Sequence, residues 1–203
     1  MAQEARRERL RTIIQHAYEA YTIGGPRPTN LHALIRINVL NAMARNAELM
    51  GFPVEGLCDD DCISPYSEDL GPLPRPQTKA LPSPSCPERL RPTPVQRRFP
   101  HHPWIDLFPF PRFRDNMILA IEAGILDDDE LCIDVAEALA PVGEETPALI
   151  VWGEAWDYWG WEVNPAFLKR WGWLLRGCPE VLEATNRWRV GRGERRIVYE
   201  EKW

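Results

Sequence analysis

The sequence predicts an all-α protein, an irregular bundle of about six helices with a long proline-rich arm and at most one short extended segment. Three observations support this prediction. Several segments repeat apolar residues at helical spacing, eleven prolines fall within residues 64–103, and a single run, Leu149–Trp152, has the composition of a buried strand. We expect residues 1–63 to form a helical pair, 64–103 an arm or linker, and 104–203 a tryptophan-rich helical part, all within one domain.

Two helices are expected before the arm. Residues 5–21 place apolar side chains on one helical face, and the glycines and proline at 24–26 end that helix. Thr29 or Asn30 can cap a second helix, which is apolar on more than one side and ends at Gly51. Three amides interrupt it, and each must tie down neighbouring main chain or line a cavity: Asn38, Asn41 and Asn46.

The prolines of the arm exclude a regular helix or a central strand between Pro65 and Pro103, because proline lacks the main-chain donor that both structures need. This segment is therefore expected to be an arm or a linker. Its later part, Leu90–Gln96, is less repetitive in composition, and we expect it to wrap the core in extended form.

Four helices are expected after the arm. The first covers about Arg112–Ala123 before a glycine, and the second covers about Asp127–Leu139 with acidic residues in its first turn. The third begins with Asn164 as cap and proline at the next position, and the fourth begins at Pro179. The charged tail beyond Gly191 is expected to be frayed.

Charge and composition exclude some classes of protein. A net charge of −6 and a pI near 5.3 do not favour general attraction to nucleic acid phosphates. The N-terminus lacks the apolar stretch of a signal peptide, and no apolar run is long enough to span a bilayer. We expect a soluble, intracellular, cytoplasmic protein that does not bind membranes, with its five scattered cysteines reduced.

The tryptophans are the strongest compositional feature, because six of the nine fall between Trp152 and Trp173. For any one of them, a place in the core is the simpler interpretation. Six in one stretch, interleaved with acidic residues, favour a concave apolar site that suits a terpenoid or polyketide. The predicted ligand-binding residues are Asn38, Trp104, Trp152, Glu154, Trp156, Asp157, Trp161 and Trp171.

A second cluster of titratable residues follows the arm. His102 is a candidate acid or base, Asp106 a candidate for orienting it, and Asp115 a third candidate catalytic residue. No nucleophile motif accompanies them. The alternative is that His101 and His102 are hydrogen-bonded anchors where the arm meets the core.

No cofactor and no metal are expected. The acidic run between Cys58 and Cys62 is the nearest approach to a metal loop, and a zinc site needs two such pairs or histidines at matching spacing. The sequence also lacks a glycine-rich phosphate loop, a nucleophile elbow and a zincin motif. An enzyme with this sequence would work without a cofactor.

Several long phrases occur in an order that is typical of one family. They are Leu57–Asp61, Ile63–Pro65, Arg91–Gln96, His101–Asn116, Asp129–Cys132, Leu149–Asp157, Gly160–Val163 and Trp171–Cys178. Over about Leu34–Glu194 the chain resembles the fungal domain of unknown function usually found C-terminal to a basic leucine zipper. The resemblance implies a fungal source and, for many relatives, a role in transcription. It implies no activity for individual residues.

A basic zipper needs a continuous basic helix and then ~4 heptads of apolar seam. The first helix here closes at residues 24–26, so the chain is expected to stand alone without a zipper and without direct DNA binding. Two hypotheses follow for its function. The first, which we slightly prefer, is a cofactor-independent cyclase or isomerase of secondary metabolism, acting on an apolar small molecule by holding a reactive conformer. The second is a regulatory or ligand-sensing module that docks on a transcription factor in the nucleus.

Overall fold

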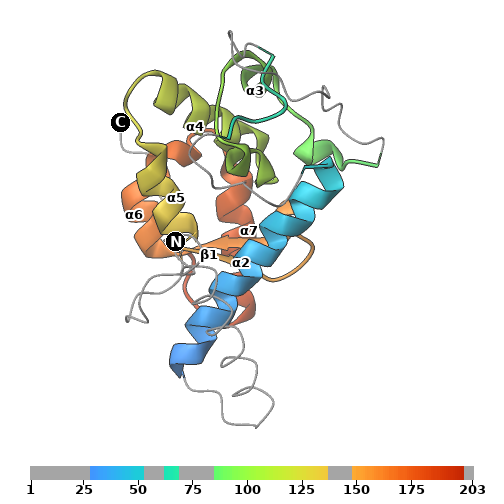
Figure 1. Cartoon of the computed structure of the whole chain (residues 1–203). Coiled ribbons are helices and arrows are strands. Elements are labelled where there is room, and N and C mark those ends of the chain that lie inside the picture. The colour runs from blue at the N-terminus through green and yellow to red at the C-terminus, as the bar shows by residue number, and fades with distance from the viewer. Residues whose placement is uncertain (1–27, 53–61, 69–84, 137–147, 199–203) are drawn as a thin grey trace.

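A computed structural model describes residues 28–52, 62–68, 85–136 and 148–198 (Figure 1). This part is mostly helical and irregular, which confirms the predicted class. Its α-helices are α2 (Pro28–Met50), α3 (Pro94–Arg98), α4 (Pro111–Glu122), α5 (Asp128–Ala136), α6 (Pro165–Trp171) and α7 (Pro179–Gly191). Its 3-10 helices are η1 (Glu88–Leu90), η2 (Pro103–Leu107), η3 (Tyr158–Gly160) and η4 (Gly172–Leu175), and its strands are β1 (Leu149–Val151) and β2 (Trp161–Val163). The helix predicted for residues 5–21 lies outside the described residues.

The long helix α2 lies where the sequence predicts the second helix, with a difference at its first turn. It begins at Pro28, so Thr29 and Asn30 lie in its first turn and neither is its cap. It ends before Gly51, whose φ of 80° is available to glycine at little steric cost. The Asn46 amide, which is fully buried, donates to the carbonyls of Leu107 and Ala155. This asparagine therefore ties down main chain, the first of the two predicted roles.

The sheet has one more strand than the sequence predicted. β1 pairs antiparallel with β2, with Leu149 opposite Val163 and Val151 opposite Trp161. β2 has only three residues, too few for an alternating pattern to be seen in the sequence. α2 packs against β1 and α7 against β2, as the crossing of α2 and β1 in Figure 1 shows. The Thr185 hydroxyl of α7 accepts the main-chain N–H of Val163 at 3.1 Å, which ties α7 to β2.

The later part of the arm is helical, and the prediction that its prolines exclude a regular helix was wrong there. Pro94 takes the first position of α3, where a helix needs no main-chain donor. Thr93 caps this helix by accepting the N–H of Gln96, while the Gln96 side chain accepts the N–H of Thr93. The arm is thus locally folded and held to α4 through contacts between the two helices.

Arg114 of α4 joins the arm to the core. Its guanidinium, which is fully buried, donates to the carbonyls of Arg89 and Arg91 in the arm. The same group donates to the carbonyls of Phe108 and, at 3.4 Å, Asp106. Four main-chain carbonyls therefore accept hydrogen bonds from one side chain. No helical pattern in the sequence indicates this role of Arg114.

An aromatic cluster forms the centre of the core. Phe108 contacts three other rings, those of Trp104, Phe113 and Trp161, at centroid distances of 6.1, 5.3 and 5.7 Å. The first two contacts are edge-to-face, a geometry that aromatic rings prefer. Phe167 extends the cluster to α6 by an edge contact with Phe113. Because these rings come from η2, α4, β2 and α6, the core holds the two halves of the described chain together.

The C-terminal elements start where the sequence predicts. The Asn164 side chain accepts the N–H of Phe167 at 2.6 Å and caps α6, and Pro179 opens α7. The tail is not frayed, at least as far as residue 198. Ile197 and Asn186 exchange two hydrogen bonds of 2.7 and 2.9 Å, which return the tail to α7.

Candidate functional site

The tryptophans predicted to form one site divide between the core and the surface. Trp161 and Trp171 are buried, with exposed fractions of 1% and 6%, whereas Trp152, Trp156 and Trp173 are 41–43% exposed. The Trp161 indole N–H donates to the Ala155 carbonyl and that of Trp171 to Asp134. Both buried rings therefore have their polar atom satisfied inside the protein, as a core residue requires.

The other predicted ligand-binding residues also have separate places. Trp104 is buried against Phe108, and the Asn38 amide donates to the carbonyl of Val151 on β1. Asp157 caps η3 by accepting the N–H of Trp159, and Glu154 is exposed. Among the described residues, these contacts place the members of the predicted set in different parts of the fold, and ligand binding by them stays a prediction.

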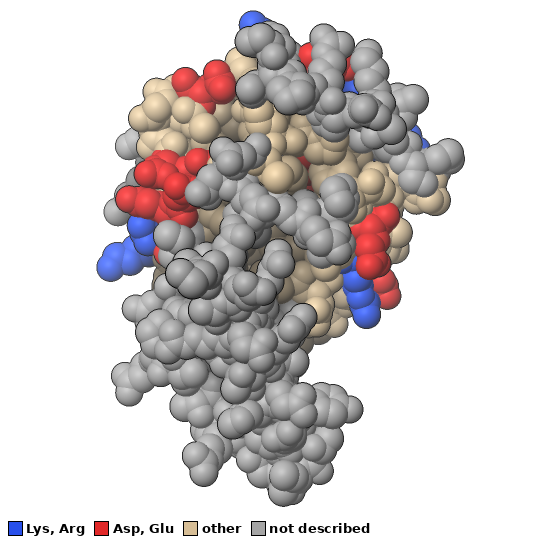
Figure 2. Space-filling model, in the orientation of Figure 1, with Lys and Arg blue, Asp and Glu red and all other residues tan. Residues whose placement is uncertain are grey.

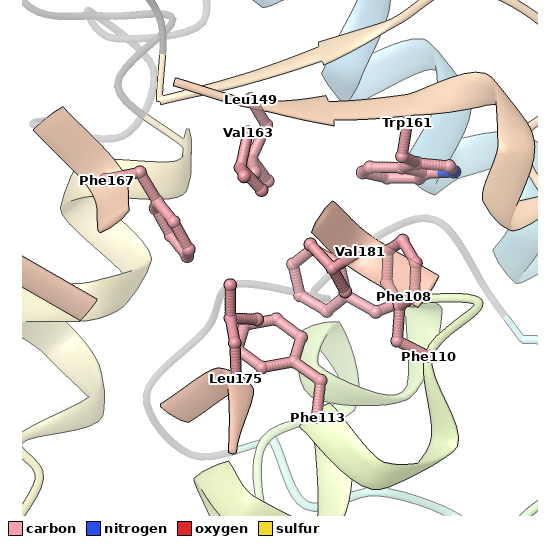
Figure 3. A pocket seen from close by; sticks show the side chains of 9 residues that line it. All are labelled: Phe108, Phe110, Phe113, Leu149, Trp161, Val163, Phe167, Leu175 and Val181. Carbon is pink, nitrogen blue, oxygen red and sulfur yellow. The ribbon is translucent and has the colours of Figure 1, made fainter. Parts of the chain in front are cut away.

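A small apolar cavity lies at the centre of the molecule (Figure 3). The centre of a water molecule can occupy about 10 Å³ of this cavity, so the cavity has room for roughly one water molecule. The lining comes from the sheet, the helices α4, α6 and α7, and the segments beside them: Phe108, Phe110, Phe113, Leu149, Trp161, Val163, Phe167, Leu175 and Val181. In this arrangement the cavity is much smaller than a site for a terpenoid or polyketide.

The three predicted catalytic residues are not brought together. His102 contacts Asp128 at the start of α5, and Asp115 accepts a hydrogen bond from the Thr93 hydroxyl. Asp106 contacts His101, at 2.8 Å from its Nε2. Their catalytic role therefore stays a prediction, and His101 rather than His102 is the partner of Asp106.

The carboxylate of Asp106 is the centre of a buried polar cluster. Besides His101 it accepts hydrogen bonds from Ser64 at 2.5 Å and from the Gln96 amide. Asp106, Ser64 and Gln96 are fully buried and His101 is 7% exposed. The cluster joins residues 62–68, the arm and η2, so its geometry fits the anchoring role proposed for His101 at the junction of arm and core.

Asp106 changes the titration of His101. Burial disfavours the charged imidazole and lowers its pKa, but the negative charge of Asp106 and the hydrogen bonds to Asp106 and the Phe99 carbonyl outweigh burial. The pKa of His101 is therefore raised above its usual value. Both ring nitrogens have an acceptor within 2.8 Å, as a protonated imidazole requires.

An exposed surface at α7 combines stacked tryptophans with arginines. We call it the tryptophan–arginine face and define it by Trp152, Trp159, Arg187, Trp188 and Arg192. The rings of Trp152 and Trp188 stack at 5.4 Å with an interplanar angle of 25°. The guanidiniums of Arg192 and Arg187 lie 5.2 Å from the ring centres of Trp152 and Trp159.

A buried carboxylate, that of Glu162, holds side chains of this face in position. Glu162 on β2 is 3% exposed and makes two hydrogen bonds, of 2.8 and 2.7 Å, to the guanidinium of Arg192. The Trp152 indole N–H donates to the same carboxylate, and the Trp188 indole N–H donates to the Trp159 carbonyl. Hydrogen bonds to Glu162, and then to Glu194, raise the pKa of Arg192. Both stacked rings are thus held in fixed positions.

Only part of the tryptophan–arginine face was predicted. Trp152 belongs to the predicted ligand-binding set, whereas Arg187, Trp188 and Arg192 were not singled out. The one signal in the sequence is the run Arg187–Arg196, which contains five arginines and one acidic residue in an otherwise acidic chain. No spacing rule links that run to Trp152, which lies more than thirty residues earlier.

Acidic residues gather at a different place. Glu130 and Asp134 of α5 pair with Arg170 of α6 at 2.9 and 2.6 Å; these two helices lie on the left in Figure 1, and Figure 2 shows red atoms beside blue ones on that side. Among the described residues, no group of three His, Cys, Asp or Glu side chains is arranged to hold a metal ion. Cys58 of the Cys58–Cys62 pair lies outside them. Within the described chain, none of the helices combines the length and apolarity of a membrane span.

Comparison with known proteins gives a family match. A family model described as a domain of unknown function (DUF3425) matches residues 75–182, just over half of the chain and a shorter span than the predicted resemblance. No curated protein and no solved structure matches at a significant level. The matched span includes Trp152, Trp159 and Glu162, and the α7 residues of the tryptophan–arginine face lie just beyond it.

Proposed function

Because the chain belongs to the family of the domain of unknown function DUF3425, which brings no assigned activity with it, we propose a function from the site. The protein is a regulatory module without catalytic activity, and it acts by docking on a partner protein through the tryptophan–arginine face. The observation that carries this proposal is the rigidly held stack of Trp152, which is 43% exposed, on the half-buried Trp188.

Two physical properties of this stack suit protein recognition. Tryptophan and arginine are the side chains most enriched at the residues that dominate binding energy in protein interfaces. Both indole N–H groups are satisfied internally, so a partner that covers the rings leaves no polar atom of theirs unpaired. The fixed ring positions also lower the entropy lost when the two proteins associate.

The partner that we propose is a transcription factor. The resemblance to a domain that usually follows a basic leucine zipper supports this choice. With a net charge of −6, the chain is not suited to binding DNA by itself. In this proposal the protein works in the nucleus and reaches DNA only through its partner.

The test is complementation of a deletion strain. Transcript levels are compared after return of the wild-type gene, Trp152→Ala or Trp173→Ala. Trp173 is the matched control, because it is 42% exposed and lies on η4, away from the stack. We expect the wild type and Trp173→Ala to restore the transcripts that the deletion changes. Trp152→Ala should fail to restore them, since loss of a central interface tryptophan typically weakens binding by about thirty-fold.

Equal restoration by both variants would refute the regulatory proposal. Circular dichroism and thermal unfolding of both purified variants exclude a trivial failure to fold. Because each ring is nearly half exposed, we expect the unfolding temperatures of the two variants to lie within a few degrees of each other.

The cofactor-independent cyclase or isomerase of secondary metabolism stays as a second proposal. Its support is the wholly apolar, mainly aromatic lining of the central cavity, which is suited to packing against a terpenoid or polyketide chain. With room for roughly one water molecule, the cavity must open for such a substrate to enter. Extract of the deletion strain, incubated with purified protein and analysed by mass spectrometry, would then show one compound replaced by an isomer of equal mass. An unchanged extract would count against this second proposal.

A further inference from the structure

We infer that the partner segment bound by the tryptophan–arginine face is acidic and carries an apolar or aromatic side chain between its acidic residues. This inference rests on the proposed function and adds the chemistry of the partner. It comes from the charge of the face, the form of its apolar surface and the contacts that already occupy its rings.

The face has an excess of positive charge. Arg189 pairs with Glu194 at 3.0 Å, and Arg192 pairs with Glu162 and Glu194 at 2.7 and 2.9 Å. Arg187, Arg195 and Arg196 are exposed, and none of them forms an ion pair with any residue that the structure describes. Three arginines in or just after α7 therefore have no acidic partner among the described residues of an otherwise acidic chain, and their charge favours a negatively charged partner.

Apolar surface lies among these charges. Trp152 is 43% exposed beside Arg192, and Val190, which lies in the same arginine-rich stretch of sequence, is 53% exposed. Acidic side chains alone would pair with the arginines and leave this apolar surface in water. A segment that combines acidic residues with one large apolar side chain satisfies both parts of the face.

A nucleic acid is a poorer match to the same surface. Nonspecific single-strand binding depends on free aromatic faces on which bases stack. The Trp152 ring already carries the stacked Trp188 ring and the Arg192 guanidinium, and Arg187 lies over Trp159. These contacts take up ring surface that bases would need. Two of the five arginines are also neutralised by Glu162 and Glu194, which repel a phosphate backbone.

The experiment is a selection of short random peptides, displayed on phage, with the full-length protein as target. The binding of the enriched peptides is then measured with wild type, Trp152→Ala, and a triple variant that carries Arg187→Gln, Arg195→Gln and Arg196→Gln. The matched controls are Trp173→Ala and a second triple variant, Arg45→Gln, Arg98→Gln and Arg112→Gln, because these side chains are exposed on α2, α3 and α4. Single-stranded DNA of about 20 nucleotides, which spans more than one usual binding site, is a competitor.

We expect acidic peptides with at least one apolar or aromatic residue. Their dissociation constants should rise by about ten-fold or more in Trp152→Ala and in the first triple variant, and should hardly change in the controls. The same weakening is expected at about 1 M salt, where the screening length falls to about 3 Å.

Three results would overturn this inference. Neutral or basic peptides that need Trp152 would refute an acidic partner and leave docking through the face intact. Displacement of the peptides by the DNA at lower concentration than by an acidic peptide would assign the face to nucleic acid. If no enriched peptide depends on Trp152, the inference fails, and the transcript test then decides separately whether the proposed function fails with it.

Discussion

Arg114 shows how one side chain can join distant parts of this fold. Burial lowers the pKa of its guanidinium to about 10, and the nearby charge of Asp106 opposes that change, so the group stays charged near neutral pH. Its cost of burial is offset by hydrogen bonds to four carbonyls, two of them in the arm. A buried cation is stable only with such compensation, and its loss would leave the four acceptors without this donor.

Arg114→Met tests this account, because methionine keeps much of the apolar volume and removes every donor. We expect the free energy of unfolding to fall by about 3–5 kcal/mol, measured by urea denaturation. Arg112→Met, two residues away and exposed, should change it by less than about 0.5 kcal/mol. Similar small losses in both variants would contradict the role assigned to Arg114.

His101 gives a dependence of stability on pH. Its pKa is raised in the folded protein, because the effect of Asp106 and of the ring's hydrogen bonds outweighs burial. The stabilisation is therefore complete below about pH 6.5, the usual pKa of an unfolded histidine, and is lost as pH rises through the folded value. Relative to His101→Gln, the wild type should be most stable in acid and lose that advantage as pH rises above about 6.5. A difference that does not change with pH would refute this prediction.

At the scale of elements, the short hairpin of β1 and β2 depends on the close approach of two chain segments. The Trp152 N–H donates to the Gly160 carbonyl at 2.7 Å across the hairpin. A Cβ atom on Gly160 would lie 3.0 Å from the Glu154 carbonyl oxygen and 3.3 Å from the Gly153 nitrogen. Both neighbours are main-chain atoms, so neither can move without distorting the loop that carries Trp152 and Trp156.

Gly160→Ala should therefore lower the free energy of unfolding by about 1–3 kcal/mol, as overpacking typically does. Gly191→Ala is the matched control, because a Cβ at this position at the end of α7 meets nothing within 4 Å. It should be neutral or stabilise by up to about 1 kcal/mol. Thermal unfolding of both variants measures the contrast, and a Gly160→Ala protein as stable as the wild type would show that the loop adapts.

Local signals in the sequence predicted the longer elements. Gly51 and Gly124 mark the ends of α2 and α4, and Asn164 with Pro165 marks the start of α6. The strand β2 and the helix α3 were missed, because three to five residues carry too little periodicity and their formation depends on packing. Within the candidate site, the contact of Trp152 with Trp188 and Arg192 joins β1 to α7, and such tertiary contacts follow from no spacing in the sequence.

At the scale of the whole molecule, the family match and the tryptophan–arginine face overlap only in part. The matched residues 75–182 supply the hairpin, Trp159 and Glu162, while α7 and its C-cap beyond them supply Arg187, Trp188 and Arg192. The hairpin is thus the component that the family pattern covers, and the charge of the face comes from outside that pattern.

The packing of α2 against β1 also determines when contacts of α2 can form during synthesis of the chain. Asn38 contacts Val151 across 113 residues of sequence. At a translation rate of about 5–20 residues per second, β1 leaves the ribosome roughly 6–23 s after this part of α2. Throughout that interval α2 lacks the strand that packs against it in the finished fold. The nascent chain is then most open to aggregation and to capture by chaperones at α2.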